Sequence, residues 1–292
     1  MKHWCVQCRI ADVVIQVDGD TAACQKEMWK FLKLYEQVEG QTPDLHFSVS
    51  LQQGVYHFSC IIGEQHMLLW SSSDDREVSA ALETRLYSQL VQYLHQEKSI
   101  ISIHAAALGV DHQAVMFAGE SGAGKSSMCT AGLLSEASYL SDEFTLLAED
   151  GLVYPFPRPM QWEHKEHPAF NRKHIENTGL ITPDYFDFPN AEGETVRCHL
   201  WHPTRVQRQP LKLKIIVLHQ YNGDLNQAVL TSIPRHEALM ELPQHLHIQA
   251  GMAKDLPLMN QRIAQDCMFY RLHFPDVFEA WKLLEDKVFS VL

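Results

Sequence analysis

The chain lacks any long apolar run. No stretch approaches the roughly 20 consecutive apolar residues that a membrane-spanning helix requires. The first residues, Met1-Lys2-His3-Trp4-Cys5, also lack the apolar segment of a secretory signal peptide. The sequence therefore predicts no membrane partner and no secretion.

Cysteine is sparse and odd in number, with seven residues among 292. Secreted disulfide frameworks place an even number of cysteines in a short chain. Scattered thiols predict a reducing compartment, and we expect a cytoplasmic protein. The C-x-x-C pair Cys5 and Cys8 lacks the second ligand pair of a zinc site, and strand alternation would put its two thiols on opposite faces. We interpret both as structural thiols.

Positive charge is also scarce. The chain carries 24 Lys and Arg against 36 Asp and Glu, a formal net charge of −12. Nucleic-acid binding needs concentrated Lys and Arg to meet the phosphate backbone, so no nucleic-acid partner is predicted. The Asn-Lys-x-Asp pattern that reads guanine is missing from the sequence, which argues against a GTPase.

What the chain does have is a complete phosphate-binding loop. The pattern G-x-x-x-x-G-K-[ST] is filled by Gly119, Glu120, Ser121, Gly122, Ala123, Gly124, Lys125 and Ser126. The apolar residues 114–118 before the loop predict a buried strand. The residues after it, 127–134 beginning at Ser127, can open a helix. This strand–loop–helix context is the one that the motif requires.

Each part of the loop has a chemical purpose. Glycines let successive N–H groups turn toward one anion, and the helix start adds its own N–H groups and dipole. Lys125 is expected to reach the β- and γ-phosphates, and Ser126 to ligate Mg²⁺. We therefore predict that residues 119–127 bind ATP together with Mg²⁺.

The remaining sequence predicts an α/β protein with two parts. Residues 1–98 are a β-rich N-terminal region that ends in an amphipathic helix over 76–97, where Leu82, Leu86, Leu90 and Leu94 form one apolar stripe. Residues 99–292 form the domain that carries the loop. Further strands are expected at 6–10, 13–17, 45–51, 55–58, 67–70, 100–104, 215–218 and 268–272, and further helices at 28–38 and 277–288. Residues 144–154 read as a hairpin, whereas 160–205 are poorly patterned.

Two acidic residues follow the loop, at Asp142 and Glu143. Adjacent carboxylates project differently, so one can face a metal ion and the other an incoming hydroxyl, as phosphoryl transfer requires. A solvated turn before the hairpin is the plainer interpretation. His104, on the strand expected before the loop strand, would orient Asp142 and tune its pKa, although a lone histidine on an apolar strand is more often a core residue.

Taken together, these segments resemble the kinase domain of HPr kinase/phosphorylase. The likeness rests on Ser102-Ile103-His104-Ala105-Ala106-Ala107, on the loop, and on Leu140-Ser141-Asp142-Glu143, and it covers roughly residues 100–160. The resemblance implies a P-loop kinase fold shared with phosphoenolpyruvate carboxykinases. It also implies transfer of the γ-phosphoryl group of ATP to a serine hydroxyl.

The resemblance also implies roles for individual residues. Asp142 would be the catalytic base, His104 its partner and Lys125 the phosphate clamp, with Ser126 and Glu143 as the Mg²⁺ ligands. Glu143 stands where the family usually has a second aspartate. The Glu-Ile-Arg-Gly type segment of the bifunctional enzymes is missing. The chain is thus more similar to stand-alone HPr-kinase-related proteins, some of which phosphorylate lasso peptide precursors.

The partner implied by this likeness is a peptide or small protein with an acceptor serine, and related enzymes imply a homo-oligomer. Two other functions stay open from the residues alone. One is a non-catalytic nucleotide-sensing module, and the other is a kinase of a free small metabolite. The pairs at His164 and His167 and at His199 and His202 have metal-like spacing, but we interpret them as solvated side chains. Arg158, between two prolines, is either a phosphate or acceptor contact or a surface arginine.

Overall fold

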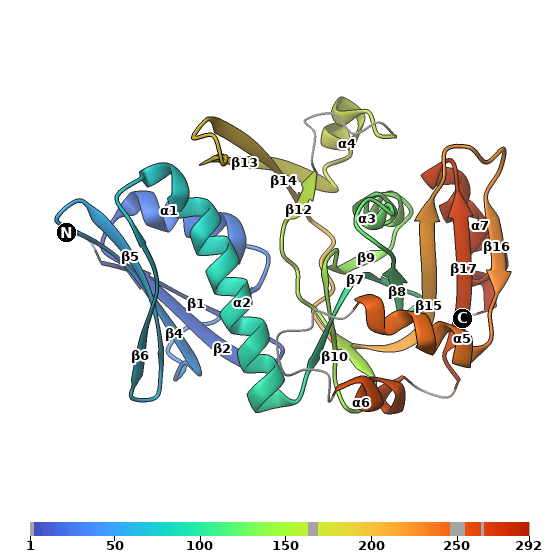
Figure 1. The fold of residues 1–292 in the computed structure, drawn as a ribbon, viewed down its shortest axis with the longest axis horizontal. Helices are drawn as coiled ribbons and strands as arrows, with labels where there is room; N and C mark the ends of the chain where they lie inside the picture. The colour runs from blue at the N-terminus through green and yellow to red at the C-terminus, as the bar shows by residue number, and fades with distance from the viewer. Residues whose placement is uncertain (1–2, 163–168, 246–254, 264–265, 292) are drawn as a thin grey trace. The chain divides into compact units, whose positions relative to one another are not determined.

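The computed structural model describes residues 3–162, 169–245, 255–263 and 266–291. The protein is mixed α/β, and its chain divides into two compact units (Figure 1). The first unit contains Met1–Glu97, Arg158–Lys165 and Thr182–His202. The second contains Lys98–Pro157, Glu166–Ile181 and Pro203–Leu292. The sequence placed one boundary near residue 98, whereas two later segments group with the first unit.

A six-stranded sheet in the order β3-β1-β2-β4-β5-β6 builds the first unit. Its pairs are antiparallel except for β2 with β4. Helices α1 and α2 lie along the sheet (Figure 1). The elements are β1 (Trp4–Ile10), β2 (Val13–Gly19), α1 (Ala22–Leu32), β3 (Glu36–Gln37), β4 (Leu45–Gln52), β5 (Val55–Ile62), β6 (Gln65–Ser72), the 3₁₀ helix η1 (Asp75–Glu77) and α2 (Val78–Lys98).

The two helices show how far local sequence determines this unit. The leucine stripe expected over 76–97 is confirmed, because Leu82, Leu86, Leu90 and Leu94 are all buried on α2. The helix expected at 28–38 is displaced toward the N-terminus. It begins at Ala22, where the Thr21 side chain accepts a hydrogen bond from the Cys24 N–H and caps the first turn.

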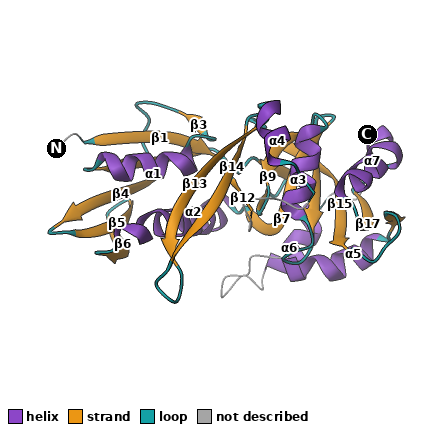
Figure 2. Ribbon diagram, turned by 90° about the horizontal axis from the view of Figure 1, so that it is seen from above, coloured by secondary structure: helices purple, strands orange, loops and turns teal. Residues whose placement is uncertain are grey.

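The poorly patterned stretch contains a three-stranded sheet in the order β12-β14-β13. Its strands are β12 (Met160–Trp162), β13 (Ile181–Pro189) and β14 (Thr195–Pro203), and helix α4 (Arg172–Thr178) lies between β12 and β13 in the chain. Figure 2 shows β13 and β14 as a long two-stranded ribbon. Most residues of this ribbon are exposed or half-buried, so no apolar alternation marked it in the sequence.

An eight-stranded sheet forms the core of the second unit, in the order β11-β10-β7-β8-β15-β17-β16 with β9 also paired to β7. The strand before the phosphate loop, β8, runs parallel to β15, and β15 runs parallel to β17. Because β11 pairs with both β10 and β15, the strands β10, β7, β8, β15 and β11 close a ring. The strands are β7 (Ile101–Val110), β8 (Gln113–Ala118), β9 (Ser138–Ser141), β10 (Phe144–Leu147), β11 (Leu152–Tyr154), β15 (Leu211–Tyr221), β16 (Val229–Ser232) and β17 (Met268–Phe274).

Helices cover this sheet and bury its apolar side chains. On one side α3 packs so closely that a Cβ on Gly132 would lie 2.4 Å from Leu108 Cδ1 and 2.6 Å from the Trp281 ring. On the other side of β7, Ile101, Ile103, Ala105 and Ala107 belong to the main core. The helices are α3 (Lys125–Leu134), α5 (Arg235–Glu241), η2 (Leu242–His245), α6 (Asp255–Arg262), α7 (Val277–Lys287) and η4 (Phe289–Val291).

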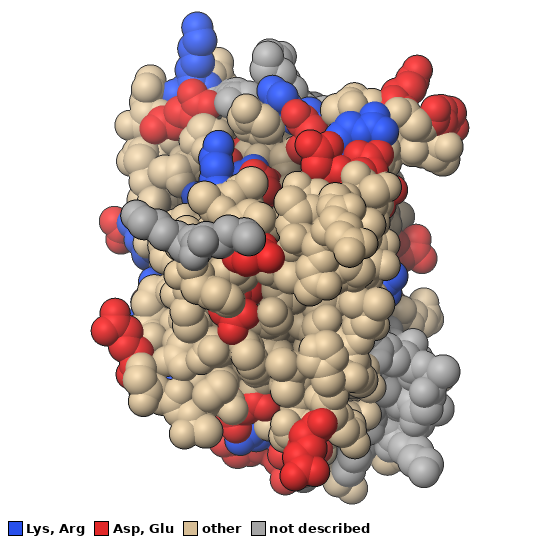
Figure 3. Space-filling model, turned by 90° about the vertical axis from the view of Figure 1, so that its left-hand side faces the viewer, with Lys and Arg blue, Asp and Glu red and all other residues tan. Residues whose placement is uncertain are grey.

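Charged side chains are unevenly distributed over the surface of the first unit. Figure 3 shows one face of the molecule, on which broad areas are uncharged and most Lys, Arg, Asp and Glu side chains stand in separate groups. Among the described residues, no helix combines the length and the apolar character needed to cross a membrane.

Candidate functional site

The phosphate loop connects the carboxyl end of β8 to the first turn of α3, as the sequence predicted. The Ala123 N–H donates to the Glu120 carbonyl across 3.1 Å and closes a turn within the loop. Gly124, which precedes the helix, has φ +100°, a left-handed conformation that residues with a Cβ rarely adopt. The loop thus contains a tight turn and a left-handed glycine, two features that phosphate-binding loops use.

Gly119 is required by close packing rather than by its backbone angle. A Cβ at this position would lie 2.5 Å from the His219 carbonyl oxygen and 2.8 Å from Ala123 Cβ. His219 follows Leu218, which pairs with Ala118 across the parallel β8 and β15 strands. The end of β15 thus forms one wall of the loop, and this contact was not visible in the motif.

Lys125 is buried and holds the loop together. Its Nζ donates to the Gly119 carbonyl across 2.8 Å and to the Glu120 carbonyl across 2.9 Å. Burial lowers the pKa of Lys125, while the charges of Glu143 and Asp142 act in the opposite direction. The ammonium group therefore lies near both predicted carboxylates and in reach of an anion bound by the loop.

Asp142 lies beside the start of α3. Ser126 Oγ donates to Asp142 Oδ2 across 3.2 Å, and the Tyr139 hydroxyl donates to Asp142 Oδ1 across 3.1 Å. The carboxylate is 6% exposed, so it is not the solvated turn of the plainer interpretation. Tyr139 was missed in the sequence because nothing in its local pattern distinguishes it from an ordinary strand residue.

His104 lies on the same face of the sheet as this carboxylate. Leu108 faces α3, and His104, four residues earlier on β7, shares that face because strand side chains alternate. Strand β7 pairs antiparallel with β9 and with β10. In these pairings Ala107 lies opposite Ser141, and His104 lies opposite Phe144. Asp142 follows Ser141 in the bend between β9 and β10, and His104 lies opposite Phe144, the residue at which the chain re-enters the sheet after that bend.

Glu143 is half-buried next to Asp142. Its N–H donates to Ser141 Oγ across 3.4 Å, at the interruption between β9 and β10. No group of three or more His, Cys, Asp or Glu side chains suited to a metal occurs among the described residues. The oxygens of Ser126, Asp142 and Glu143 nevertheless suit Mg²⁺, which takes one or two carboxylates and completes its shell with water and substrate phosphates.

The other predicted loop residues differ in exposure. Glu120, Ser121 and Gly122 are exposed, whereas Ser127 is half-buried in the first turn of α3. The structure therefore brings Lys125, Ser126, Asp142 and Glu143 to one place beside the loop and sets His104 on the neighbouring strand.

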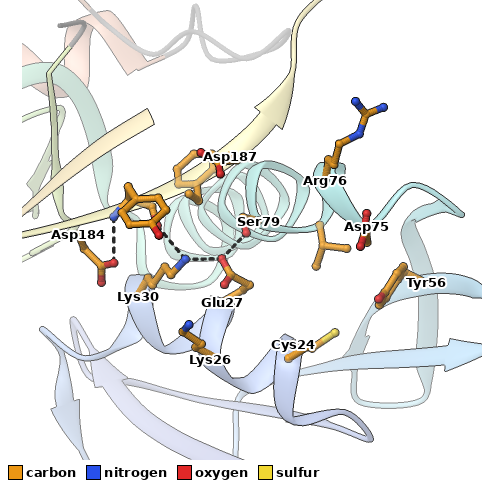
Figure 4. A pocket seen from close by; sticks show the side chains of 14 residues that line it. Cys24, Lys26, Glu27, Lys30, Tyr56, Asp75, Arg76, Ser79, Asp184 and Asp187 are labelled. Atoms are coloured by element: carbon orange, nitrogen blue, oxygen red, sulfur yellow. Dashed lines mark hydrogen bonds and ion pairs between the residues drawn. The ribbon is translucent and has the colours of Figure 1, made fainter. Parts of the chain in front are cut away.

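A separate cavity of about 380 Å³ lies within the first unit, between α1, the start of α2, β5 and β13. Figure 4 shows Glu27 between Lys30 and Ser79, both of which it contacts. Lys30 Nζ also donates to the Tyr185 carbonyl across 2.8 Å. These polar side chains satisfy one another, and none of the predicted nucleotide-site residues lines the cavity.

Several other sequence interpretations can be compared with the structure. Cys5 is exposed and Cys8 is buried, as strand alternation predicted, and burial raises the pKa of both thiols. The interpretation of His202 as solvated is wrong, because it is 2% exposed on its side chain and lies 3.5 Å from Asp184. His164 and His167 lie outside the described residues.

Arg158 is not a surface side chain. It is 6% exposed, and its Nη2 donates to Glu83 Oε1 on α2 across 3.0 Å. The guanidinium also lies over the Tyr87 ring, 5.4 Å from the ring centroid. Within the first unit, Arg158 therefore anchors the segment before β12 to α2.

A scan against protein-family models and a search of curated proteins both found no match to this chain.

Proposed function

We propose that the protein is a P-loop kinase of the HPr kinase type that transfers the γ-phosphoryl group of ATP to a serine hydroxyl. The proposal rests on the sequence resemblance and on one observation above all. The buried Asp142 carboxylate accepts hydrogen bonds from Ser126, at the start of the loop helix, and from Tyr139. A buried carboxylate held beside the phosphate loop supplies a proton acceptor of the kind that phosphoryl transfer needs.

The chain's own residues divide the work as follows. The loop N–H groups and the Lys125 ammonium hold the β- and γ-phosphates, with Lys125 leaving its two carbonyl partners for the nucleotide. Asp142 accepts the proton of the incoming serine hydroxyl, and Ser126 and Glu143 supply oxygens to Mg²⁺. Bound Mg²⁺ neutralises charge between the phosphates. Placement and electrostatics provide most of the rate enhancement.

Hydrogen bonding gives Asp142 a fixed orientation before substrate binds. Tyr139 occupies Oδ1 and Ser126 occupies Oδ2, so the carboxylate plane is set by two elements, β9 and α3. The Ser126 hydroxyl would hold Mg²⁺, and Asp142 Oδ2 would then accept the proton of the nucleophile. The acceptor that we propose is a peptide or small protein, on the resemblance to stand-alone enzymes that act on lasso peptide precursors.

Intact-mass analysis tests this function directly. The full-length protein is incubated with MgATP and serine-containing peptides encoded beside its gene, and each peptide is then weighed. We expect the gain of one phosphate on one peptide, mapped to serine by fragmentation. Asp142→Asn keeps the size and the Tyr139 contact, so it should bind ATP but transfer no phosphate.

Two results would count against the proposal. ATP binding without transfer to any peptide would favour the nucleotide-sensing module. Phosphorylation of free serine or another small metabolite, with peptides unchanged, would favour a metabolite kinase. Full transfer by Asp142→Asn would remove this residue from the base role.

A further inference from the structure

The carboxyl end of β15 carries an exposed aromatic side chain beside the phosphate loop. Tyr221 is the last residue of β15 and is 54% exposed. Its backbone N–H donates to the Ala123 carbonyl across 3.0 Å, so the residue is tied to the loop. The middle of β15, residues 215–219, is buried, whereas Gln220 and Tyr221 at its end are exposed.

The Tyr221 ring packs against an aromatic residue of the neighbouring strand. Tyr221 pairs with Phe274 at the matching end of β17, and their ring centroids are 6.1 Å apart in an edge arrangement. Phe274 is buried, and its Cζ would lie 3.1 Å from a Cβ on Gly124. The Asn222 N–H donates to the Phe274 carbonyl across 2.8 Å and joins the two strand ends. Phe274 therefore links Tyr221 to the residue at which α3 begins.

The position of Tyr221 matches that of a ligand site in parallel sheets. Ligands bind outside the carboxyl ends of the parallel strands, and β8, β15 and β17 are three such neighbours. The loop after β8 would hold the phosphates, so the rest of a nucleotide has to lie over an adjacent strand end. Gly223 lies beside the Tyr221 ring, because a Cβ there would come within 3.1 Å of the Tyr221 hydroxyl.

From this arrangement we propose that Tyr221 is the stacking platform for the base of the bound nucleotide. The inference rests on the proposed function, since it assumes phosphates in the loop. An aromatic ring is suited to the flat, uncharged base and not to phosphate. Stacking of a base on an aromatic side chain strengthens binding by about 5- to 150-fold and tolerates any base. Tyr221 would thus make the site bind nucleotides more tightly than bare polyphosphates, with little selectivity among the bases.

Binding of two probes tests the assignment. Titration calorimetry with Mg²⁺ compares ATP with inorganic tripolyphosphate, which has the phosphates and no base. Tyr221→Ala should weaken ATP binding by about 5- to 150-fold and leave tripolyphosphate binding unchanged. Tyr221→Phe keeps the ring and should bind ATP as the wild type does. Tyr185→Ala removes a tyrosine of the first unit that is 47% exposed, and it should change neither affinity.

The outcomes separate this inference from the proposed function. If the wild type binds neither probe, the proposed function fails. If the wild type binds both and Tyr221→Ala weakens both equally, or weakens neither, the base does not stack on this ring. A raised KM for the acceptor peptide with unchanged ATP affinity would assign Tyr221 to the acceptor and overturn the inference.

Discussion

Ser126 Oγ donates to Asp142 Oδ2 across 3.2 Å, which joins the first turn of the loop helix to the acidic pair between β9 and β10. The two residues are 16 positions apart in the chain, and only the fold brings them together. The hydroxyl predicted to ligate Mg²⁺ and the carboxylate predicted to accept a proton are therefore direct neighbours. Their contact leads to the first prediction.

Removing the hydroxyl of Ser126 should reduce transfer more than nucleotide binding. Ser126→Ala keeps the hydrogen bond from Tyr139 to Asp142 and removes one Mg²⁺ oxygen. We expect kcat to fall by about 10²–10³, the usual loss for one transition-state contact. Ser126→Thr keeps the hydroxyl and serves as the control. Steady-state rates over a Mg²⁺ series provide the measurement, and equal rates for the Ala variant and wild type would contradict the metal role.

Lys125 is expected to bind the β- and γ-phosphates of ATP. Lys125→Ala should weaken ATP binding by about 10- to 100-fold, because hydrogen bonds to charged groups contribute about 1.5–3 kcal/mol. AMP, which lacks the β- and γ-phosphates, should bind unchanged. Lys212→Ala removes another lysine that donates to a carbonyl of the second unit, that of Asp150, and is the matched control. Parallel losses for ATP and AMP would indicate a collapsed loop instead.

Gly119 should tolerate no side chain. Gly119→Ala brings a Cβ to 2.5 Å from the backbone oxygen of His219, so either the loop or the end of β15 must move. Overpacking of this kind costs about 1–3 kcal/mol of stability. We expect a lower melting temperature and weaker ATP binding together, measured by thermal unfolding with and without ATP. Wild-type ATP affinity in this variant would show that the wall formed by β15 does not shape the loop.

The sequence predicted those elements whose structure depends on a contiguous residue pattern. The strand expected at 45–51 is β4, Leu45–Gln52, because alternation against a buried face is a local property. The loop lies between β8 and α3 for a similar reason, since its glycines and apolar flanks are contiguous.

Features that depend on tertiary contacts were not predictable. The β13–β14 ribbon is largely exposed or half-buried, so its sequence lacks the periodic apolar pattern from which a strand is predicted. Tyr139 and His219 resemble ordinary strand residues in the sequence. Their roles come from the pairing of β9 with β7 and of β15 with β8, which joins segments distant in the chain.

Arg158 and Glu83 form a buried ion pair that should be far more sensitive than the exposed pairs of the same unit. Arg158→Leu leaves the buried Glu83 carboxylate without its charged partner and with the Gln161 amide as a donor, and breaking a buried ion pair typically costs about 3–5 kcal/mol. The double variant Arg158→Leu with Glu83→Leu should recover most of that loss. Arg197→Leu breaks an exposed pair with Asp187 and should cost about 1 kcal/mol or less. Urea unfolding of the full chain measures all four proteins, and a double variant no better than Arg158→Leu would contradict the argument.

His219 should make the second unit sensitive to acid. Burial, followed by the charge of Lys125, lowers the pKa of His219 to about 3, and its ring nitrogens have no hydrogen-bond partner in good geometry among the described residues. A histidine with a lowered pKa takes up its proton in the unfolded chain first. Stability is therefore complete above the ordinary pKa of about 6.5 and is lost as pH falls toward 3.

His219→Leu removes this titration and suits the neighbouring rings of Phe117 and Phe274. Between pH 6.5 and pH 4 the wild type should lose about 3 kcal/mol more of its unfolding free energy than this variant does, at about 1.4 kcal/mol per unit of pKa shift. His66→Asn replaces an exposed histidine of the first unit and should follow the wild-type profile. Denaturant unfolding over this pH range provides the measurement. Identical pH profiles for wild type and His219→Leu would mean that the imidazole is protonated in the folded protein, which its apolar surroundings argue against.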